Sequence, residues 1–331
     1  MRVAKIYLWP YESLRRMSDS EARQFVLDAL LLVKAVPIAA DRIAVLCHYQ
    51  PALAEGLHLS QVLTVDFDGR WSDIGRFRWH GVDMALRGGA ELLVLGRDGQ
   101  VGSILAGNVS ESWLEEGRAM GPMRGIVSSG DATLAFGMNR HVYISDSTTW
   151  RRFEHGFDDT APGAEIDFDA LLDDMGGLNA VARTSADSVI AVGMNGEIWR
   201  SPIARDAWVK EASSTHVGLS AVCIEEDGAE VAAGQAGIVL RNTGGAHWTE
   251  QPYTGPQRLD FTGAVAVPGG VLLADGHALR RLRSGTLEQV TMGTPEVVPA
   301  VKLSAGFGLV VGCAPKELFF SRDGLSWTLL L

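Results

Sequence analysis

The sequence predicts an all-β fold in which small four-stranded sheets form a ring. Glycine accounts for 38 of 331 residues, short apolar runs alternate with turn residues, and this pattern repeats at a spacing near 41 residues. A single four-stranded sheet cannot bury both of its apolar faces, whereas a closed ring of sheets buries each face against a neighbour. Short strands with glycine turns in repeats of this length are typical of a β-propeller.

Six repeats align on a glycine between two apolar runs. These glycines are 41, 56, 41, 42 and 36 residues apart, namely Gly96, Gly137, Gly193, Gly234, Gly276 and Gly312. Another apolar run precedes each hairpin, at 82–86, 124–129, 178–184, 219–225, 261–267 and 298–304. A tryptophan follows five of the hairpins, as Trp113, Trp150, Trp208, Trp248 and Trp327. Each repeat is therefore predicted to hold four strands.

The first 80 residues extend the pattern. Residues 33–80 contain the runs VKAVPI, RIAVLCHYQ, QVLTVDFDG and RFRWHG, which predict a seventh blade. Six blades with a longer N-terminal extension are the alternative. Residues 5–9 predict a strand and residues 18–32 a helix, with Ser18 and Glu21 as its capping box.

The predicted domain organisation has two parts. The strand and helix of residues 1–32 pack on a propeller formed by residues 33–331. Its blades are expected at about 33–80, 82–117, 124–155, 178–212, 218–252, 261–292 and 298–331.

The stretch SRDGLSW (321–327) lies between the third and fourth strands of the last repeat. It resembles the Asp-box, the bacterial neuraminidase repeat, which also occurs in photosystem assembly factors. The resemblance implies that Ser321 and Asp323 hold a tight hairpin through backbone amides, that Gly324 takes a positive φ, and that Trp327 packs between sheets. Because the Asp-box is a scaffold element, it implies a fold and no activity.

A second stretch, RNTGGAHW (241–248), resembles the same motif in a degraded form. Gly244, Gly245 and Trp248 are expected to be structural Asp-box residues there. Arg241 and Thr243 are expected at the positions of the Ser and the Asp.

Composition narrows the function. The net charge of −11 argues against nucleic acid and favours a neutral or basic partner. Cys47, Cys223 and Cys313 are isolated in apolar runs, which predicts buried reduced thiols and neither a disulfide framework nor a zinc site. No signal-peptide pattern opens the chain, and charges and a proline interrupt its longest apolar region, at 25–40. We expect a cytoplasmic protein without a membrane span.

No catalytic or cofactor motif stands out. The sequence has no P-loop, no dinucleotide fingerprint after a strand, no nucleophile elbow and no HExxH, and its eight histidines are scattered. We therefore expect no cofactor, no metal and no catalytic residues. The alternative is a propeller enzyme, a glycosidase or lyase, in which carboxylates from separate blades meet at the axis.

The long gap between Gly137 and Gly193 contains an acidic segment, residues 155–177, with no Lys or Arg. Its seven acids are Asp158, Asp159, Glu165, Asp167, Asp169, Asp173 and Asp174. It joins the outer strand of one blade to the inner strand of the next, and in propellers such connections lie on a ligand-binding face. One interpretation is a small surface helix at 168–175. The other is a site for a basic partner, attracted by electrostatic steering, and a calcium loop is a weaker third possibility.

A basic run at 277–285 is interpreted as a solvated outer strand rather than a phosphate site. Together these features predict a non-enzymatic propeller that binds another protein. An immunity protein that neutralises a basic toxin fits this description, and so does an assembly factor. The acidic segment is the predicted partner-binding site.

Overall fold

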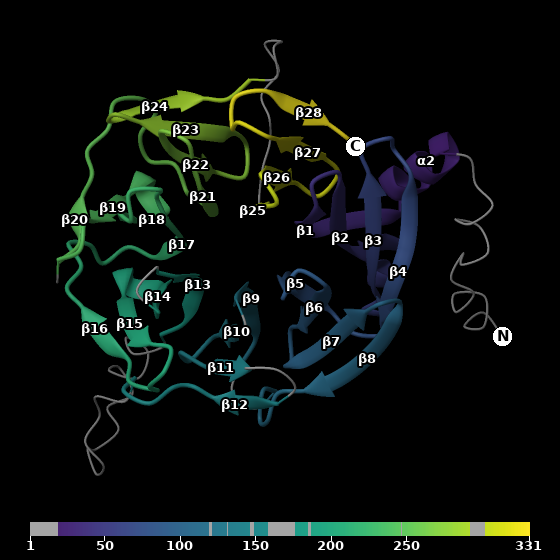
Figure 1. The fold of residues 1–331 in the computed structure, drawn as a ribbon, viewed down its shortest axis with the longest axis horizontal. Helices are drawn as coiled ribbons and strands as arrows, with labels where there is room; N and C mark the ends of the chain where they lie inside the picture. The colour runs from purple at the N-terminus through teal and green to yellow at the C-terminus, as the bar shows by residue number, and fades with distance from the viewer. Residues whose placement is uncertain are drawn as a thin grey trace.

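The protein is a ring of seven four-stranded antiparallel sheets, the blades (Figure 1). The structure is a computed structural model that describes residues 19–118, 121–130, 132–145, 149–157, 176–184, 187–245, 247–291 and 302–331. Each blade is one contiguous stretch of chain whose strands follow one another from the axis to the rim. The prediction of an all-β, seven-bladed propeller is confirmed, and the six-bladed alternative is wrong.

The first four blades run as follows. Blade 1 comprises β1 (Leu30–Ala39), β2 (Arg42–Tyr49), β3 (Ser60–Asp66) and β4 (Trp71–Phe77). Blade 2 comprises β5 (Gly81–Arg87), β6 (Glu91–Gly96), β7 (Gln100–Leu105) and β8 (Asn108–Trp113). Blade 3 comprises β9 (Met123–Ser129), β10 (Ala132–Gly137), β11 (Val142–Ser145) and β12 (Trp150–Arg152). Blade 4 comprises β13 (Leu178–Arg183), β14 (Ser188–Gly193), β15 (Ile198–Pro202) and β16 (Val209–Glu211).

The last three blades complete the ring. Blade 5 comprises β17 (Leu219–Ile224), β18 (Glu230–Gly234), β19 (Val239–Asn242) and β20 (Thr249–Glu250). Blade 6 comprises β21 (Gly263–Val267), β22 (Gly270–Ala274), β23 (Leu279–Arg283) and β24 (Thr286–Gln289). Blade 7 comprises β25 (Lys302–Gly306), β26 (Leu309–Cys313), β27 (Leu318–Ser321) and β28 (Trp327–Leu329). The described helices are α2 (Asp19–Ala29), α3 (Gln50–Ala54), η2 (Met194–Gly196) and η3 (Gln235–Gly237).

The N-terminal helix is shorter than predicted. It ends at Ala29, and Leu30 already begins β1, where it pairs with Tyr49 of β2. Tertiary pairing overrides the helical pattern here, because the amide of Leu32 also donates to the carbonyl of Pro315 at 2.9 Å. The predicted strand at 5–9 and the capping residue Ser18 lie outside the described residues.

The core of the protein is divided among the seven interfaces between blades. Among the described residues there are seven clusters of buried hydrophobic side chains, and each draws its members mainly from two neighbouring blades. One cluster, for example, joins Leu46 of blade 1 to Val94 of blade 2, and another joins Val192 of blade 4 to Leu240 of blade 5. Burial of both faces of each sheet is the physical reason for the ring.

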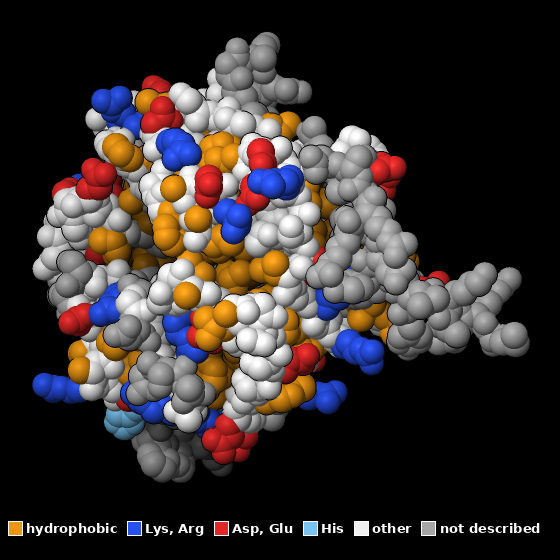
Figure 2. Space-filling view, turned by 45° about the vertical axis from the view of Figure 1, so that its right-hand side comes forward, with side chains coloured by type: hydrophobic (Ala, Val, Ile, Leu, Met, Phe, Trp, Pro, Cys, Tyr) orange, Lys and Arg blue, Asp and Glu red, His pale blue; other side chains and the backbone are white. Residues whose placement is uncertain are grey.

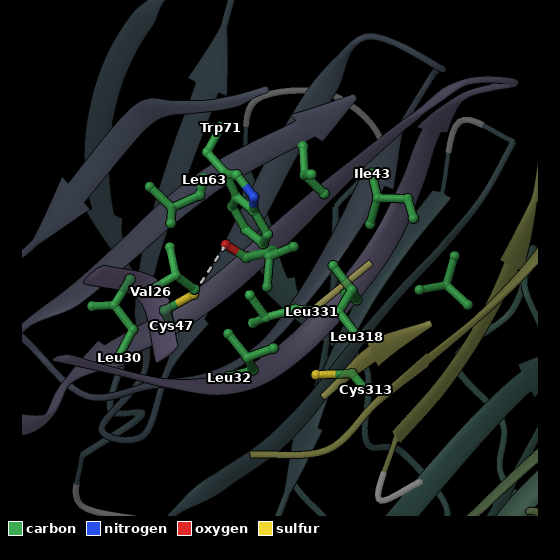
Figure 3. Close-up of a cluster of buried hydrophobic side chains, with 14 residues drawn as sticks. Val26, Leu30, Leu32, Ile43, Cys47, Leu63, Trp71, Cys313, Leu318 and Leu331 are labelled. Atoms are coloured by element: carbon green, nitrogen blue, oxygen red, sulfur yellow. Dashed lines mark hydrogen bonds between the residues drawn. The ribbon is translucent and has the colours of Figure 1, made fainter. Parts of the chain in front are cut away.

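The ring closes where blade 7 meets blade 1, and Figure 3 shows the buried cluster at this seam. Val26 of α2 and Leu30 of β1 lie in the same cluster as Leu318 of β27 and Leu331. The ammonium of Lys316 donates to the carbonyl of Leu30 at 2.8 Å. Among the described strands, no blade combines strands from the two ends of the chain, so the closure seen there rests on packing and a few polar contacts.

The hairpin at 321–327 has the hydrogen bonds that its sequence implies. The Ser321 hydroxyl accepts from the amide of Gly324 at 2.8 Å, and Asp323 Oδ1 accepts from the amides of Leu325 and Ser326 at 2.8 and 2.7 Å. These two amides lower the pKa of Asp323 to about 2. Gly324 has a φ of +71°.

Trp327 then packs between blades 6 and 7. Its ring meets that of Phe319 edge to face, with centroids 5.4 Å apart.

The hairpin at 241–248 uses a different residue from the one predicted. Asn242 Oδ1 accepts from the amides of Gly244 and Gly245 at 3.0 and 2.9 Å, whereas Arg241 pairs with Glu225. The assignment of the Ser and Asp positions to Arg241 and Thr243 is therefore wrong by one residue. Asn242 ends its strand as Ser321 does, and a tryptophan follows six residues later in both hairpins.

The tryptophans of the repeats do not all play one role. Trp248 is buried, and its indole nitrogen donates to Glu211 Oε2 of the preceding blade at 2.6 Å. Trp113, in contrast, is 60% exposed on β8, and Leu114 is the buried residue there. The tryptophan spacing located the outer strands but did not show which indoles are buried.

The interpretation of residues 277–285 as a solvated strand is wrong for two of its arginines. Arg280 and Arg281 are each only 8% exposed on β23, the third strand of its blade. Arg280 Nε donates to Asp275 Oδ2 at 2.7 Å, and Arg281 Nη2 donates to the carbonyl of Pro268 at 2.6 Å. These cations are structural members of blade 6.

We predict that Leu30→Ala at the seam lowers the free energy of unfolding by about 2–5 kcal/mol, because a fully buried leucine leaves a cavity. The matched control, Leu329→Ala, removes a side chain that is 47% exposed and should change stability by less than about 0.5 kcal/mol. Urea unfolding of both variants measures the difference. Equal effects would contradict the importance of the seam.

We predict that Asp323→Ala lowers stability at pH 7 by about 1 kcal/mol through loss of its hydrogen bonds. The native state depresses the pKa of Asp323 from 3.8 to about 2, so its ionised form stabilises the fold above pH 3.8 and this contribution is lost as the pH falls to 2. The difference between variant and parent should shrink over that interval in denaturant titrations. Asp323→Asn, which keeps an acceptor oxygen, should lose less.

Candidate functional site at the propeller axis

A continuous hollow follows the axis of the ring. A wide mouth of about 970 Å³ opens on one face, a constriction of about 170 Å³ follows, and a cavity of about 570 Å³ opens on the other face. The mouth is lined by residues from loops between second and third strands, such as Met194, and from connections between blades, such as His216. We call this face the crossover face, because the chain passes there from each blade to the next.

Each blade contributes one polar side chain to the constriction, from its inner strand or the residue directly before it. We call this set the axial ring; its members are Lys34, Asp83, Arg124, Asn179, Ser220, Thr262 and Lys302. Three of the seven are basic and one is acidic. The propeller axis therefore carries an excess of positive charge, although the chain as a whole is acidic.

Members of the axial ring bind the neighbouring blade. Asn179 Nδ2 donates to the carbonyl of Leu219 at 2.7 Å, and Asp83 Oδ2 accepts from the amide of Ile126 at 3.0 Å. Arg124 Nη1 donates to Asn179 Oδ1. Each of these bonds joins one blade to the next around the axis, so the polar ring contributes to the assembly of the blades.

The cations of the axial ring differ in the hydrogen bonds and opposite charges that surround them. Lys34 Nζ donates to the carbonyl of Leu303 at 3.3 Å and lies 3.7 Å from Asp83 Oδ1. Lys302 has no hydrogen-bond or ion-pair partner within the described ranges. Burial lowers the pKa of Lys302, an effect that Asp83 opposes and Lys34 reinforces. Burial also lowers the pKa of Arg124.

Two histidines of a cluster of three, His48 and His80, line the mouth, and the third, His58, contacts His80. His48 Nε2 donates to the carbonyl of Gly81 at 2.7 Å, since a carbonyl can only accept. The rings of His48 and His80 have centroids 4.1 Å apart, and His80 Nδ1 lies 3.2 Å from His58 Nδ1. Burial, followed by the charges of His48 and His58, lowers the pKa of His80 to about 4, so this imidazole is neutral near pH 7. A neutral imidazole at a pocket mouth is chemically able to accept a proton.

The predicted partner-binding residues of the acidic segment lie outside the described residues; they are Asp158, Asp159, Glu165, Asp167, Asp169, Asp173 and Asp174. The C-terminal end of the segment, at Gly177, is held to the propeller by backbone and side-chain hydrogen bonds. The carbonyl of Gly177 accepts from the amide of Met194 at 2.9 Å, and Glu197 Oε1 accepts from the amide of Gly177 at 3.2 Å. Because Met194 lines the mouth, the segment rejoins the propeller on the crossover face.

Charge on the described surface is mixed. Figure 2 shows acidic and basic side chains interspersed with hydrophobic ones over one side of the ring. Without the seven acids of the acidic segment, the chain has 33 acidic residues against 29 basic ones. Most of the net negative charge therefore comes from that segment.

Two further observations concern metals and membranes. Across the residues that the structure describes, no group of three or more His, Cys, Asp or Glu side chains is arranged to hold a metal ion. Within the same residues, no helix is both long and apolar enough to cross a membrane.

All three cysteines are buried free thiols, as predicted, and burial raises the pKa of Cys223 and of Cys313 to about 12.

Sequence reasoning missed the axial ring. Its signal was present, since most of the apolar inner runs carry a polar residue near their start, as in VDMAL, RGIVSS and LNAVART. One polar residue in one strand means little. The repetition of this feature in register with the propeller repeats would have indicated a polar axis.

Comparison with solved structures supports the fold. A catalytically inactive virginiamycin B lyase from Staphylococcus aureus with quinupristin has a TM-score of 0.65 and 12% identity, over 90% of this chain and 94% of that one. The WD40 β-propeller domain of Doa1 has a TM-score of 0.64 and 9% identity, over 89% and 94%. YCF48 bound to D1 peptide has a TM-score of 0.59 and 14% identity, over 89% of each chain. At these identities the likeness concerns the fold alone.

Sequence comparison gives a closer relationship. No protein-family model matches the chain. Immune protein Tsi7 from Pseudomonas aeruginosa strain PAO1, however, is 32% identical over 243 residues, which cover 72% of this chain and 75% of that protein. The chain therefore belongs to the family of Immune protein Tsi7.

Proposed function

We propose that this protein is an immunity protein that binds a protein toxin and blocks its action. The observation that carries the proposal is the relationship to Immune protein Tsi7 over three quarters of that protein's length. The fold is consistent with this role, because a propeller presents one broad rigid face to a partner while loops between strands supply the contacts. No catalytic chemistry is required for protection by binding.

The partner-binding site in this proposal is the crossover face, including the acidic segment. The segment contributes seven negative charges and no positive ones. Its return to the propeller at Gly177 is fixed by hydrogen bonds to Met194 and Glu197. A dense negative charge accelerates encounter with a basic surface and disfavours acidic partners. We therefore propose a basic toxin surface as the ligand.

Two related properties are part of the same proposal. The protein acts in the cytoplasm, where its free thiols remain reduced. The hairpin at 321–327 is of the Asp-box type, supported by the amide bonds of Ser321 and Asp323. In this view the hairpins are scaffold, and binding depends on loops of the crossover face.

The proposal is tested with the tagged chain as bait in a lysate of cells that produce its native partner. Mass spectrometry identifies the captured protein, and co-expression then shows whether this chain restores growth of cells that make it. Replacement of Asp158, Asp159, Asp173 and Asp174 by Asn should lower the association rate at low salt by about tenfold, because steering is lost. Surface plasmon resonance at two salt concentrations measures this rate and its salt dependence.

A matched control removes the same charge from the opposite face. Asp41, Asp68, Asp187 and Asp227 are exposed and lie in loops joining first to second or third to fourth strands, away from the crossover face. Their replacement by Asn should leave the association rate within about twofold of the parent. An equal loss in both variants would mean that only net charge matters, and unchanged binding in the first would remove the acidic segment from the site.

A second candidate is an enzyme with its pocket at the axis. The observation that favours it is the neutral His80 beside His48 and His58 at a mouth of about 970 Å³. A lyase fits better than a glycosidase, because the carboxylates of Asp83 and Asp260 line different cavities. His80→Asn separates the two candidates, since it should leave toxin binding and growth protection intact. Loss of protection without loss of binding would favour the enzyme.

A further inference from the structure

The axial ring has an excess of two positive charges in a narrow polar space. Lys34, Arg124 and Lys302 converge there from blades 1, 3 and 7, and Asp83 is the single carboxylate among the seven members. We propose that this constriction binds an anionic group, a carboxylate or a phosphate, held by Lys302 together with Arg124 and Lys34. This inference does not depend on the proposed immunity function.

Lys302 is the residue that points most directly to a missing anion. Arg124 is bonded to Asn179, and Lys34 has both Leu303 and Asp83 as neighbours. Lys302 has no side-chain hydrogen bond or ion pair in the described part of the chain; the charge of Asp83 attracts it, while those of Lys34 and Arg124 repel it. Three cations gathered around one carboxylate repel one another, so an anion bound between them would offset that repulsion.

The space suits a small anionic group. The constriction has a volume of about 170 Å³, roughly that of six waters at about 30 Å³ each. Arg124, Asn179 and Lys302 line both the constriction and the mouth, so an anion that enters from the crossover face reaches these side chains directly. Charge-assisted bonds from guanidinium and ammonium groups are the strong type for carboxylates and phosphates.

The anionic group has two possible sources. It belongs either to a free small anion or to an acidic side chain of a bound polypeptide, and the chemistry at Lys302 is the same for both. The chain alone is titrated calorimetrically with inorganic phosphate, with citrate, and with an acetylated Gly-Gly-Asp-Gly-Glu peptide. Saturable binding of any of these probes supports the site, and the probe that binds identifies the source.

The sharpest test uses two variants with opposite expected effects. Lys302→Met should weaken binding of the anion about tenfold or more, because one charge-assisted bond is lost. Asp83→Asn should strengthen binding severalfold, because the competing carboxylate becomes neutral while Asn can still accept from the amide of Ile126. A general disturbance of the channel would weaken binding in both variants.

The unliganded chain gives a second readout. Without anion, the Lys302→Met variant should have a higher midpoint of thermal unfolding than the parent. Addition of the anion should raise the midpoint of the parent and leave that of the variant unchanged. Lys210→Met, which removes an exposed lysine from β16, should keep the anion response. The proposal is overturned if no probe binds the parent, or if Lys302→Met binds the anion as tightly as the parent does.

Discussion

The structure depends on the burial of two apolar faces on every sheet. A blade of four short strands exposes one face to each neighbour, and only a closed ring leaves no face uncovered. The division of the core into seven clusters, each between two blades, is the direct result of this constraint. Hairpins such as the one held by Asp323 then fix the outer strands at the rim.

The same constraint separates the scaffold from the surfaces available for binding. Side chains between blades are committed to packing, so variation is confined to the loops, the rim and the axis. The axis is polar because each blade contributes one polar side chain to it. Arg280, a buried cation of blade 6, pairs with Asp275 within the scaffold. Lys302 at the axis, in contrast, has no ion pair among the residues that the structure describes.

Much of the fold followed from the sequence, because repeats make weak local signals add up. The turn glycines and apolar runs predicted the blade count and most inner strands. The prediction from local sequence pattern was wrong where strand pairing determines the conformation. Leu30, for example, belongs to β1 and does not extend the helix. It also failed by one residue at Asn242, because the geometry of the strand end, rather than the residue type, selects the side chain that holds the hairpin. The axial site was missed since its members are far apart in sequence and meet only through the symmetry of the ring.

The seam between the first and last blades has a consequence for how the chain folds. The ammonium of Lys316 contacts the carbonyl of Leu30 across 286 residues of sequence. During synthesis the first blade therefore remains uncovered on one side until the last blade has emerged, and contacts of such long range form slowly. Newly made protein therefore passes through a stage in which one apolar face of the first blade is exposed. At that stage, binding to chaperones or association with other chains competes with closure of the ring.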